Sequence, residues 1–235
     1  MGEDSTRPTT VTAALILAGG KSTRMGSPKH LLKHPDGRPA YRFIHDVISG
    51  AYPQLRSRTY ISLARDSLLD RELSSRAAEA VSPPLAPGLS IIWDNDDDTS
   101  GANTHGDASS DKTASGGPAK GLLAAWRAHP EETWLVLACD YPRLTPAAVQ
   151  CLVRAHVPPV TCFRNRDGFC EPLVSIWGPA ALAQLARNVE AGRQGPSWTI
   201  RQIGGTVLDL PNEGVAEGWL CNVNNREEWD EAFRV

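Results

Sequence analysis

The sequence alternates between short apolar runs and longer segments in which apolar residues recur with helical spacing. Seven runs predict β-strands, at residues 12–18, 59–64, 89–93, 133–139, 160–163, 172–177 and 206–210. The first (TAALILA) and the fourth (TWLVLAC) contain no charged residue. Continuous apolar runs of this length are typical of strands that are buried on both faces of a sheet.

The segments between these runs predict helices at residues 39–48, 121–128, 145–156, 179–190 and 226–233. Thr145 and Pro146 form a typical helix start, with threonine as the N-cap and proline in the first turn. Strands that alternate with helices indicate an α/β fold. We therefore expect a Rossmann-like three-layer domain with a mostly parallel sheet.

Residues 95–115 interrupt this order, because the segment contains almost no apolar residue. Such a segment cannot bury enough surface to offset the entropy of ordering it, so we predict a mobile polar insert. Its run of three aspartates, 96–98, is better explained as a solvated loop than as a metal site. We expect a flexible tail at residues 1–10 and one domain over residues 11–235 that carries this insert.

Composition narrows the classes of function. The chain has 235 residues, a formal net charge of −3, and five cysteines, none of them in a Cys-x-x-Cys pair. The odd, scattered cysteines argue against a disulfide framework or a thiolate zinc site, and they favour a reducing, cytoplasmic location. The small net charge does not favour binding to nucleic acid or to a membrane surface. Every apolar run is shorter than the roughly 20 residues that a membrane span requires.

The chemistry of the chain is expected where the predicted strands end, because ligands of open parallel sheets bind beyond the carboxyl ends of the strands. Gly19 and Gly20 follow the first predicted strand, Asp94 follows the third, and Asp140 follows the fourth. These four residues therefore define the predicted site.

The loop after the first strand reads LAGGKSTRMGSPK. It fits neither the Walker loop nor the Gly-x-Gly-x-x-Gly dinucleotide fingerprint. Adjacent glycines let backbone N–H groups approach a phosphate closely, Arg24 can bind it with two hydrogen bonds, and Lys29 supplies a point charge. The loop therefore suits a nucleoside triphosphate, although a tight strand–helix turn with surface cations fits the same residues.

Asp140 directly follows an apolar strand and precedes Tyr141 and Pro142. Its carboxylate can bind Mg²⁺, which takes one or two protein carboxylates together with phosphate oxygens, or it can simply shape a turn. The triphosphate loop favours the metal role, because a triphosphate needs its charge neutralised. Cys139 is expected to be a buried strand residue, since no histidine is placed to activate it as a nucleophile.

Five motifs, in order, resemble those of the MobA-like nucleotidyltransferases. They are LAGGKSTRMGSPK, SGGPAKG at 115–121, LACDYP at 137–142, EPL at 171–173 and NVNNR at 222–226. The resemblance covers about residues 11 to 233, nearly the whole chain. It implies the fold of nucleotide-diphospho-sugar transferases and the transfer of a nucleoside monophosphate from an NTP, with release of pyrophosphate.

The resemblance also implies roles for individual residues. The predicted nucleotide-binding residues are Leu17, Ala18, Gly19, Gly20, Lys29, Asp94, Gly117, Pro118 and Asp140. The predicted catalytic residues are Lys29, Arg24 and Asp140. The predicted metal ligands are Asp140 and Asn224, which would hold Mg²⁺. The predicted acceptor-binding residues are Glu171, Pro172 and Asn222. Asp94 matches the aspartate that reads guanine in guanylyltransferases of the family.

The sequence departs from the family pattern at two places, both on the side of the site that recognises the base in the family. Lys120 replaces a small or apolar residue of the family motif, and the insert separates Asp94 from the Gly-Gly-Pro loop. The resemblance favours GTP as the donor and a molybdopterin-type phosphate acceptor, with transient contact with molybdoenzymes or cofactor-synthesis proteins. The alternatives are a cytidylyltransferase, a sugar-phosphate nucleotidyltransferase, and a catalytically silent nucleotide-binding module.

Overall fold

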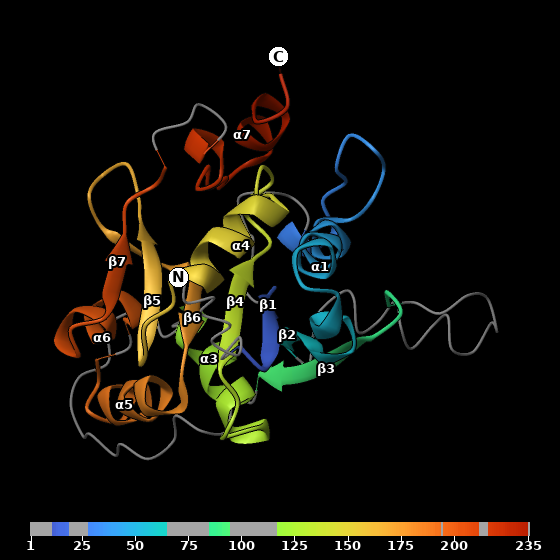
Figure 1. The fold of residues 1–235 in the computed structure, drawn as a ribbon. Coiled ribbons are helices and arrows are strands. Elements are labelled where there is room, and N and C mark those ends of the chain that lie inside the picture. The colour runs from blue at the N-terminus through green and yellow to red at the C-terminus, as the bar shows by residue number, and fades with distance from the viewer. Residues whose placement is uncertain are drawn as a thin grey trace, which may run out of the picture.

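The computed structural model describes residues 11–18, 28–64, 85–94, 117–193, 195–211 and 216–234. Seven strands are formed: β1 (Ala13–Leu17), β2 (Thr59–Ala64), β3 (Leu89–Asp94), β4 (Trp134–Ala138), β5 (Val160–Arg164), β6 (Cys170–Trp177) and β7 (Thr206–Leu208). The α-helices are α1 (Ala40–Ala51), α3 (Gly117–Ala128), α4 (Pro146–Arg154), α5 (Pro179–Glu190), α6 (Pro196–Gln202) and α7 (Arg226–Glu231). Short 3₁₀ helices are η1 (Lys29–Leu31), η2 (Pro53–Arg58) and η4 (Ala216–Gly218). Figure 1 shows their arrangement.

The strands form one sheet in the order β3-β2-β1-β4-β6-β5-β7. β3, β2, β1 and β4 are parallel neighbours, whereas β6 is antiparallel to both β4 and β5, and β7 is parallel to β5. Only β6 therefore runs against the other described strands. Because β6 is reversed, it begins at the edge of the sheet where the others end.

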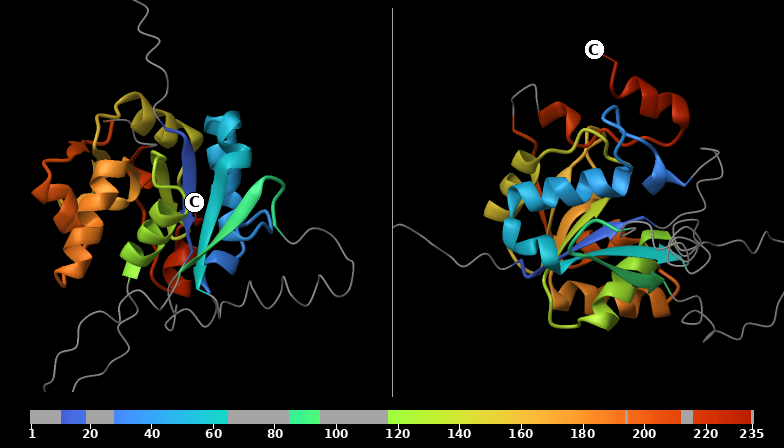
Figure 2. Two further views of the ribbon diagram at one scale, coloured as in Figure 1. Left: turned by 90° about the horizontal axis from the view of Figure 1, so that it is seen from below. Right: turned by 90° about the vertical axis from the view of Figure 1, so that its right-hand side faces the viewer.

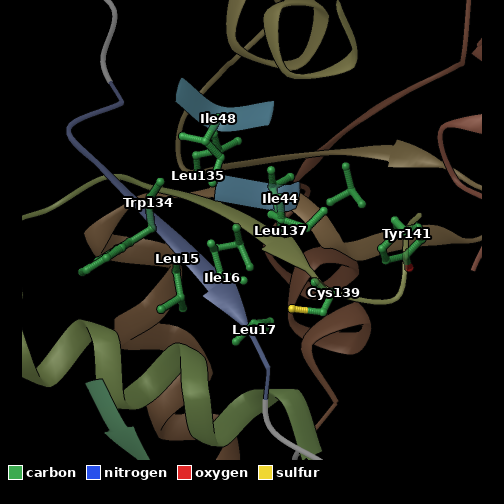
Figure 3. Close-up of a cluster of buried hydrophobic side chains, with 14 of the residues drawn as sticks. Leu15, Ile16, Leu17, Ile44, Ile48, Trp134, Leu135, Leu137, Cys139 and Tyr141 are labelled. Carbon is green, nitrogen blue, oxygen red and sulfur yellow. The ribbon is translucent and has the colours of Figure 1, made fainter. Parts of the chain in front are cut away.

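Helices cover both faces of the sheet (Figure 2): α1 and α4 lie on one face, and α3 and α5 lie on the other. In Figure 3, Ile44 and Ile48 of α1 lie over Leu135, Leu137 and Ile16, all of them buried. β1 and β4 are the central strands and are buried along their whole length, as their apolar runs require. The expected three-layer α/β architecture and mostly parallel sheet are confirmed.

Most predicted elements are present, with shifted ends. Residues 179–190 form α5 as predicted, and the Thr145 side chain caps α4 by accepting a hydrogen bond from the Ala148 N–H at 3.3 Å. The prediction that a helix begins at Gly121 is wrong, since α3 already begins at Gly117. Gly117 has φ +54°, a backbone conformation that glycine adopts without strain.

The start of the sixth strand was also placed too late: β6 begins at Cys170, so Cys170 and Glu171 belong to the strand as well. The register between β5 and β6 shifts after Cys162, and Pro172 lies in the resulting irregularity. A proline lacks the N–H of a regular ladder position and is tolerated at such a bulge. Helix α6 was not predicted, because PSWTIRQ mixes apolar and polar residues without a clear period.

Several predictions lie outside the described residues: the tail at 1–10, the insert at 95–115, and the positions of Gly19, Gly20 and Arg24. They stay predictions. Within the described ranges, every helix is too short or too polar to cross a bilayer.

Candidate active site

The ends of four parallel strands form the edge at which the predicted site residues lie. In the strand register, Leu17 of β1 is paired with Ala138 of β4 and with Ser62 of β2, which is paired in turn with Ile92 of β3. Asp140 and Asp94 each lie two residues beyond this line, Asp140 in the turn after β4 and Asp94 at the end of β3. Three strand spacings, about 14 Å, therefore separate the two carboxylates along the edge. They can contact opposite ends of one extended nucleotide.

Lys29 begins the 3₁₀ helix η1, which is attached to the end of β1 through His30. The His30 ring donates from Nδ1 to the Ala18 carbonyl oxygen at 3.2 Å. Burial lowers the pKa of His30 to about 4, so the ring is neutral at pH 7. The hydrogen bond from this neutral ring holds η1 against the end of β1. It therefore positions Lys29, whose side chain extends toward Asp140.

The contacts of the Lys29 ammonium include three oxygen atoms of the described residues. It donates to the carbonyl oxygen of Val223 at 2.9 Å, lies 3.3 Å from Oδ2 of Asp140, and lies 3.5 Å from Oδ1 of Asn224. Lys29 and Asp140 are both mostly buried, with side-chain exposures of 24% and 15%. The structure thus brings Lys29 together with Asp140 and Asn224, which are 111 and 195 positions away from it in sequence.

The C-terminal turn is held against Asp140 by its own backbone. The Val223 N–H donates to the Asp140 carbonyl oxygen at 3.0 Å. The next residues form a helix cap: Asn225 accepts from the Glu228 N–H, and the Glu228 carboxylate accepts from the Asn225 side chain and from the Asn224 N–H at 2.6 Å. The cap fixes the backbone that carries Asn224.

The donor set around Lys29 fits Mg²⁺. A carboxylate, a carbonyl and an amide oxygen are the hard ligands that this ion prefers. Oδ1 of Asp140 is buried and has no hydrogen-bond partner in the described part of the chain, as expected for an oxygen that binds a cation. No group of three or more His, Cys, Asp or Glu side chains suited to a metal occurs among the described residues. Mg²⁺ commonly binds through one or two protein carboxylates and completes its ligand shell with water and substrate phosphates.

Two of the predicted acceptor-binding residues, Glu171 and Asn222, lie around Tyr141. The Tyr141 hydroxyl is buried and makes no hydrogen bond of good geometry within the described residues, yet Glu171 and Asn222 are close enough to affect its pKa. In Figure 3 the hydroxyl points away from the labelled core residues. Burial raises the pKa of Glu171, whose Oε1 accepts from the Leu173 N–H at 3.2 Å.

The predicted base-binding residues lie farther along the edge, on β3 and α3. Oδ1 of Asp94, at the end of β3, accepts a hydrogen bond from the Ser62 hydroxyl of β2. Gly121 of α3 packs on Ser62 and Leu17 so closely that a Cβ atom there would lie 2.7 Å from Leu17 Cδ2 and nearer still to Ser62 Oγ. Gly117 and Pro118 lie one turn earlier on α3 and are exposed.

Cys139 is buried at the end of β4, and burial raises the pKa of its thiol well above the ordinary value. A thiol that stays protonated at neutral pH is a poor nucleophile. The structure thus supports the reading of Cys139 as a buried core residue.

Three groups at the site were missed at the level of sequence. The Val223 carbonyl is a backbone group and leaves no sequence signal. Ser62 is the polar residue in the apolar stretch ISLA, and Tyr141 directly follows Asp140 in LACDYP. Both residues could therefore have been identified from the sequence. A buried polar residue at the carboxyl end of a parallel strand is a candidate site residue.

Comparison with known proteins identifies the family of the chain. Residues 14–205 match the family described as "MobA-like NTP transferase domain". The chain is 27% identical over 218 residues to a "Molybdenum cofactor biosynthesis bifunctional protein" of Synechocystis. The alignment covers 92% of this chain and 52% of the relative, so the chain spans about half the length of that protein.

Two solved structures share the fold. Molybdopterin-guanine dinucleotide biosynthesis protein A from Archaeoglobus fulgidus has a TM-score of 0.60 at 19% identity, over 94% of this chain and 96% of that one. A cytidylyltransferase from Leptospira borgpetersenii has a TM-score of 0.57 at 13% identity, over 94% and 84%. These likenesses establish the nucleotide-diphospho-sugar transferase type of fold. With the family match over most of its length, the chain belongs to the MobA-like NTP transferase domain family.

Proposed function

We propose that the protein transfers a nucleoside monophosphate from an NTP, preferably GTP, to the terminal phosphate of a molybdopterin-type acceptor. Pyrophosphate is the leaving group. The observation that carries this proposal is the convergence of Lys29, Asp140 and Asn224 at the end of the central strands. A cation, a carboxylate and an amide oxygen at that edge match the needs of phosphoryl chemistry, in which positioning and charge stabilisation provide most of the catalysis.

Each residue has a specific task in this proposal. Asp140 and Asn224 hold Mg²⁺, and the carbonyl oxygen of Val223 faces the same space. When bound, Mg²⁺ supplies a Lewis acid that neutralises phosphate charge. Lys29 binds the α-phosphate and stabilises the charge that develops there, with Arg24 and the backbone of Gly19 and Gly20 on the remaining phosphates.

Guanine selection is assigned to Asp94. Guanine offers two donors on one edge, its N1–H and its exocyclic amine, and one carboxylate can accept from both. The hydrogen bond from Ser62 holds this carboxylate at the end of β3. The base would lie beyond β3, next to the start of α3, where Gly117 and Pro118 are exposed.

The acceptor is assigned to the other side of Asp140, where Glu171 and Asn222 lie around Tyr141. Glu171 reaches the shared edge because β6 runs against the other described strands. The names of the Synechocystis relative and of the Archaeoglobus protein support a molybdopterin-type acceptor. Handing a reactive product on would involve brief contact with molybdoenzymes or with other proteins of cofactor synthesis.

The test is pyrophosphate release with each of the four NTPs, with Mg²⁺, and with molybdopterin or a sugar phosphate as acceptor. Guanylyl transfer to molybdopterin gives release that requires GTP, metal and acceptor together. Transfer of CMP, or transfer to a sugar phosphate, gives release with a different pair of substrates. A silent nucleotide-binding module binds an NTP and releases no pyrophosphate with any pair, and that result would refute the proposal.

A further inference from the structure

The space next to Asp140 already holds a positive charge. The Lys29 ammonium lies among the Val223 carbonyl oxygen, Oδ2 of Asp140 and Oδ1 of Asn224, at 2.9, 3.3 and 3.5 Å. These oxygens are also the described groups best suited to bind a divalent cation. We propose that the Lys29 ammonium and the divalent cation occupy this pocket alternately, so that Lys29 keeps the metal out until a nucleotide binds.

Charge repulsion is the reason for this exclusion. Among the described residues the Lys29 ammonium pairs with the Asp140 carboxylate, and Glu171, the carboxyl close enough to interact with Asp140, accepts a hydrogen bond from the Leu173 N–H. Glu228, the next acidic side chain at the turn, is engaged by the Asn224 N–H and by Asn225. A divalent ion placed beside the ammonium would meet a cation within a few ångströms in a partly buried space, where Coulomb repulsion is strong. One of the two must leave.

The triphosphate provides the reason for Lys29 to leave. This step rests on the proposed function, in which Lys29 binds the α-phosphate. Phosphate oxygens give the ammonium a partner of higher charge than Asp140, and they also supply the additional ligands that Mg²⁺ requires. Lys29 and the metal therefore change places as the nucleotide binds, and the metal binds with the nucleotide or after it.

The experiment measures binding of Mn²⁺ alone, without nucleotide, by the loss of its free-ion electron paramagnetic resonance signal. Lys29→Met removes the competing charge and is expected to bind Mn²⁺ more tightly than the wild-type protein, on the order of tenfold or more. Lys29→Arg keeps a cation and should bind as weakly as wild type. Lys29→Met combined with Asp140→Asn should lose the gain, which would place the ion at Asp140.

Lys33→Met is the matched control, because it makes the same change of charge at an exposed lysine four residues away. It should leave Mn²⁺ affinity unchanged. If Lys29→Met does not fold, Lys29→Gln replaces it, with folding checked by circular dichroism. Equal Mn²⁺ affinity in the wild type and in a folded uncharged variant, Lys29→Met or Lys29→Gln, would overturn the proposal, as would a similar gain in Lys33→Met.

Failure of this inference and failure of the proposed function are distinguishable, because the titration contains no nucleotide and no acceptor. A wild-type protein that transfers nucleotides but binds Mn²⁺ as tightly as Lys29→Met disproves only the exchange. A tighter-binding Lys29→Met in a protein that releases no pyrophosphate disproves only the transferase activity.

Discussion

The Ser62 hydroxyl donates a hydrogen bond to Oδ1 of Asp94, and so joins the ends of the neighbouring strands β2 and β3. Ser62 is fully buried, whereas Asp94 is partly exposed at the sheet edge. The carboxylate is therefore held from within the protein while it faces the region proposed for the base. This pair places a rigid acceptor at one end of the site.

The first prediction concerns the base. Guanine can donate twice to the Asp94 carboxylate, and a charged acceptor left without donors costs about 1–3 kcal/mol or more. GTP should thus bind at least about tenfold more tightly than CTP, since about 1.4 kcal/mol corresponds to a factor of ten. Competition binding of the four NTPs measures this. Asp94→Asn should narrow the difference strongly, and Ser62→Ala should narrow it less. Selectivity that is unchanged in Asp94→Asn would refute the assignment.

The second prediction concerns Gly121. A methyl group there would overlap Ser62 and Leu17, so Gly121→Ala should destabilise the protein by about 1–3 kcal/mol, as overpacking does. Gly50→Ala in α1 is the control, because its Cβ would meet only Pro146 Cγ at 3.5 Å. That change should be neutral or stabilising, since alanine is the better helix former. Melting temperatures of both variants decide the matter, and equal losses would contradict the close packing.

The third prediction concerns Asp140. Asp140→Asn removes the charge that pairs with Lys29 and is proposed to bind the metal. We expect turnover to fall on the order of 10²–10³-fold, the effect of losing one electrostatic contact at the transition state. The circular dichroism spectrum should be unchanged. Asp46→Asn, at an exposed aspartate paired with Arg38, is the control and should keep full activity. Near-normal turnover of Asp140→Asn would rule out the metal role.

The fourth prediction concerns pH. Burial lowers the pKa of His30 to about 4 in the folded state, against 6.5 when unfolded. Between these values the unfolded chain binds a proton at this position and the folded chain does not, so stability falls as the pH falls from about 6.5 to about 4. The contribution of His30 to this loss is about 3 kcal/mol.

His30→Asn tests this effect, because asparagine keeps an N–H donor for the Ala18 carbonyl and cannot titrate. Denaturant unfolding of wild type and variant between pH 7 and pH 4.5 should give a difference in stability that shrinks as the pH falls. The pKa values of His34, His45 and His156 are also lowered. Because these histidines are present in both proteins, their contributions cancel in the difference in stability. A constant difference would show that His30 does not titrate in this way.

The sequence was most informative where one local property decides the structure. Uninterrupted apolar runs correctly indicated β1 and β4, because only a central strand buries every residue. The ends of α3 and β6 were misjudged because tertiary packing decides them. The close contact of Gly121 with Ser62 is a long-range relationship, and so is the pairing of Cys170 and Glu171 with β5 beyond the register shift.

The same distinction between local and long-range properties applies to the site. Asp140 and Asp94 were recognisable because each follows a predicted strand, and a general rule places ligands there. That Lys29 bonds to the Val223 carbonyl was not predictable, because the partner is a backbone atom 194 residues away. The helix cap of Asn225 and Glu228 had a readable Asn-x-x-Glu pattern, but its role in holding Asn224 depends on the folded turn.

The reversed direction of β6 divides the sheet into two halves that meet at β4. One half, β1 to β3, carries the residues assigned to the donor, and the other, β5 to β7, presents Glu171 on a hairpin. If the acceptor binds at Glu171 as proposed, changes in the hairpin that leads into Glu171, residues 164–171, are expected to alter the acceptor while Asp94 and Ser62 stay as they are. Under that assignment, donor and acceptor preference are expected to change independently, and exchange of the hairpin is a way to alter the acceptor alone.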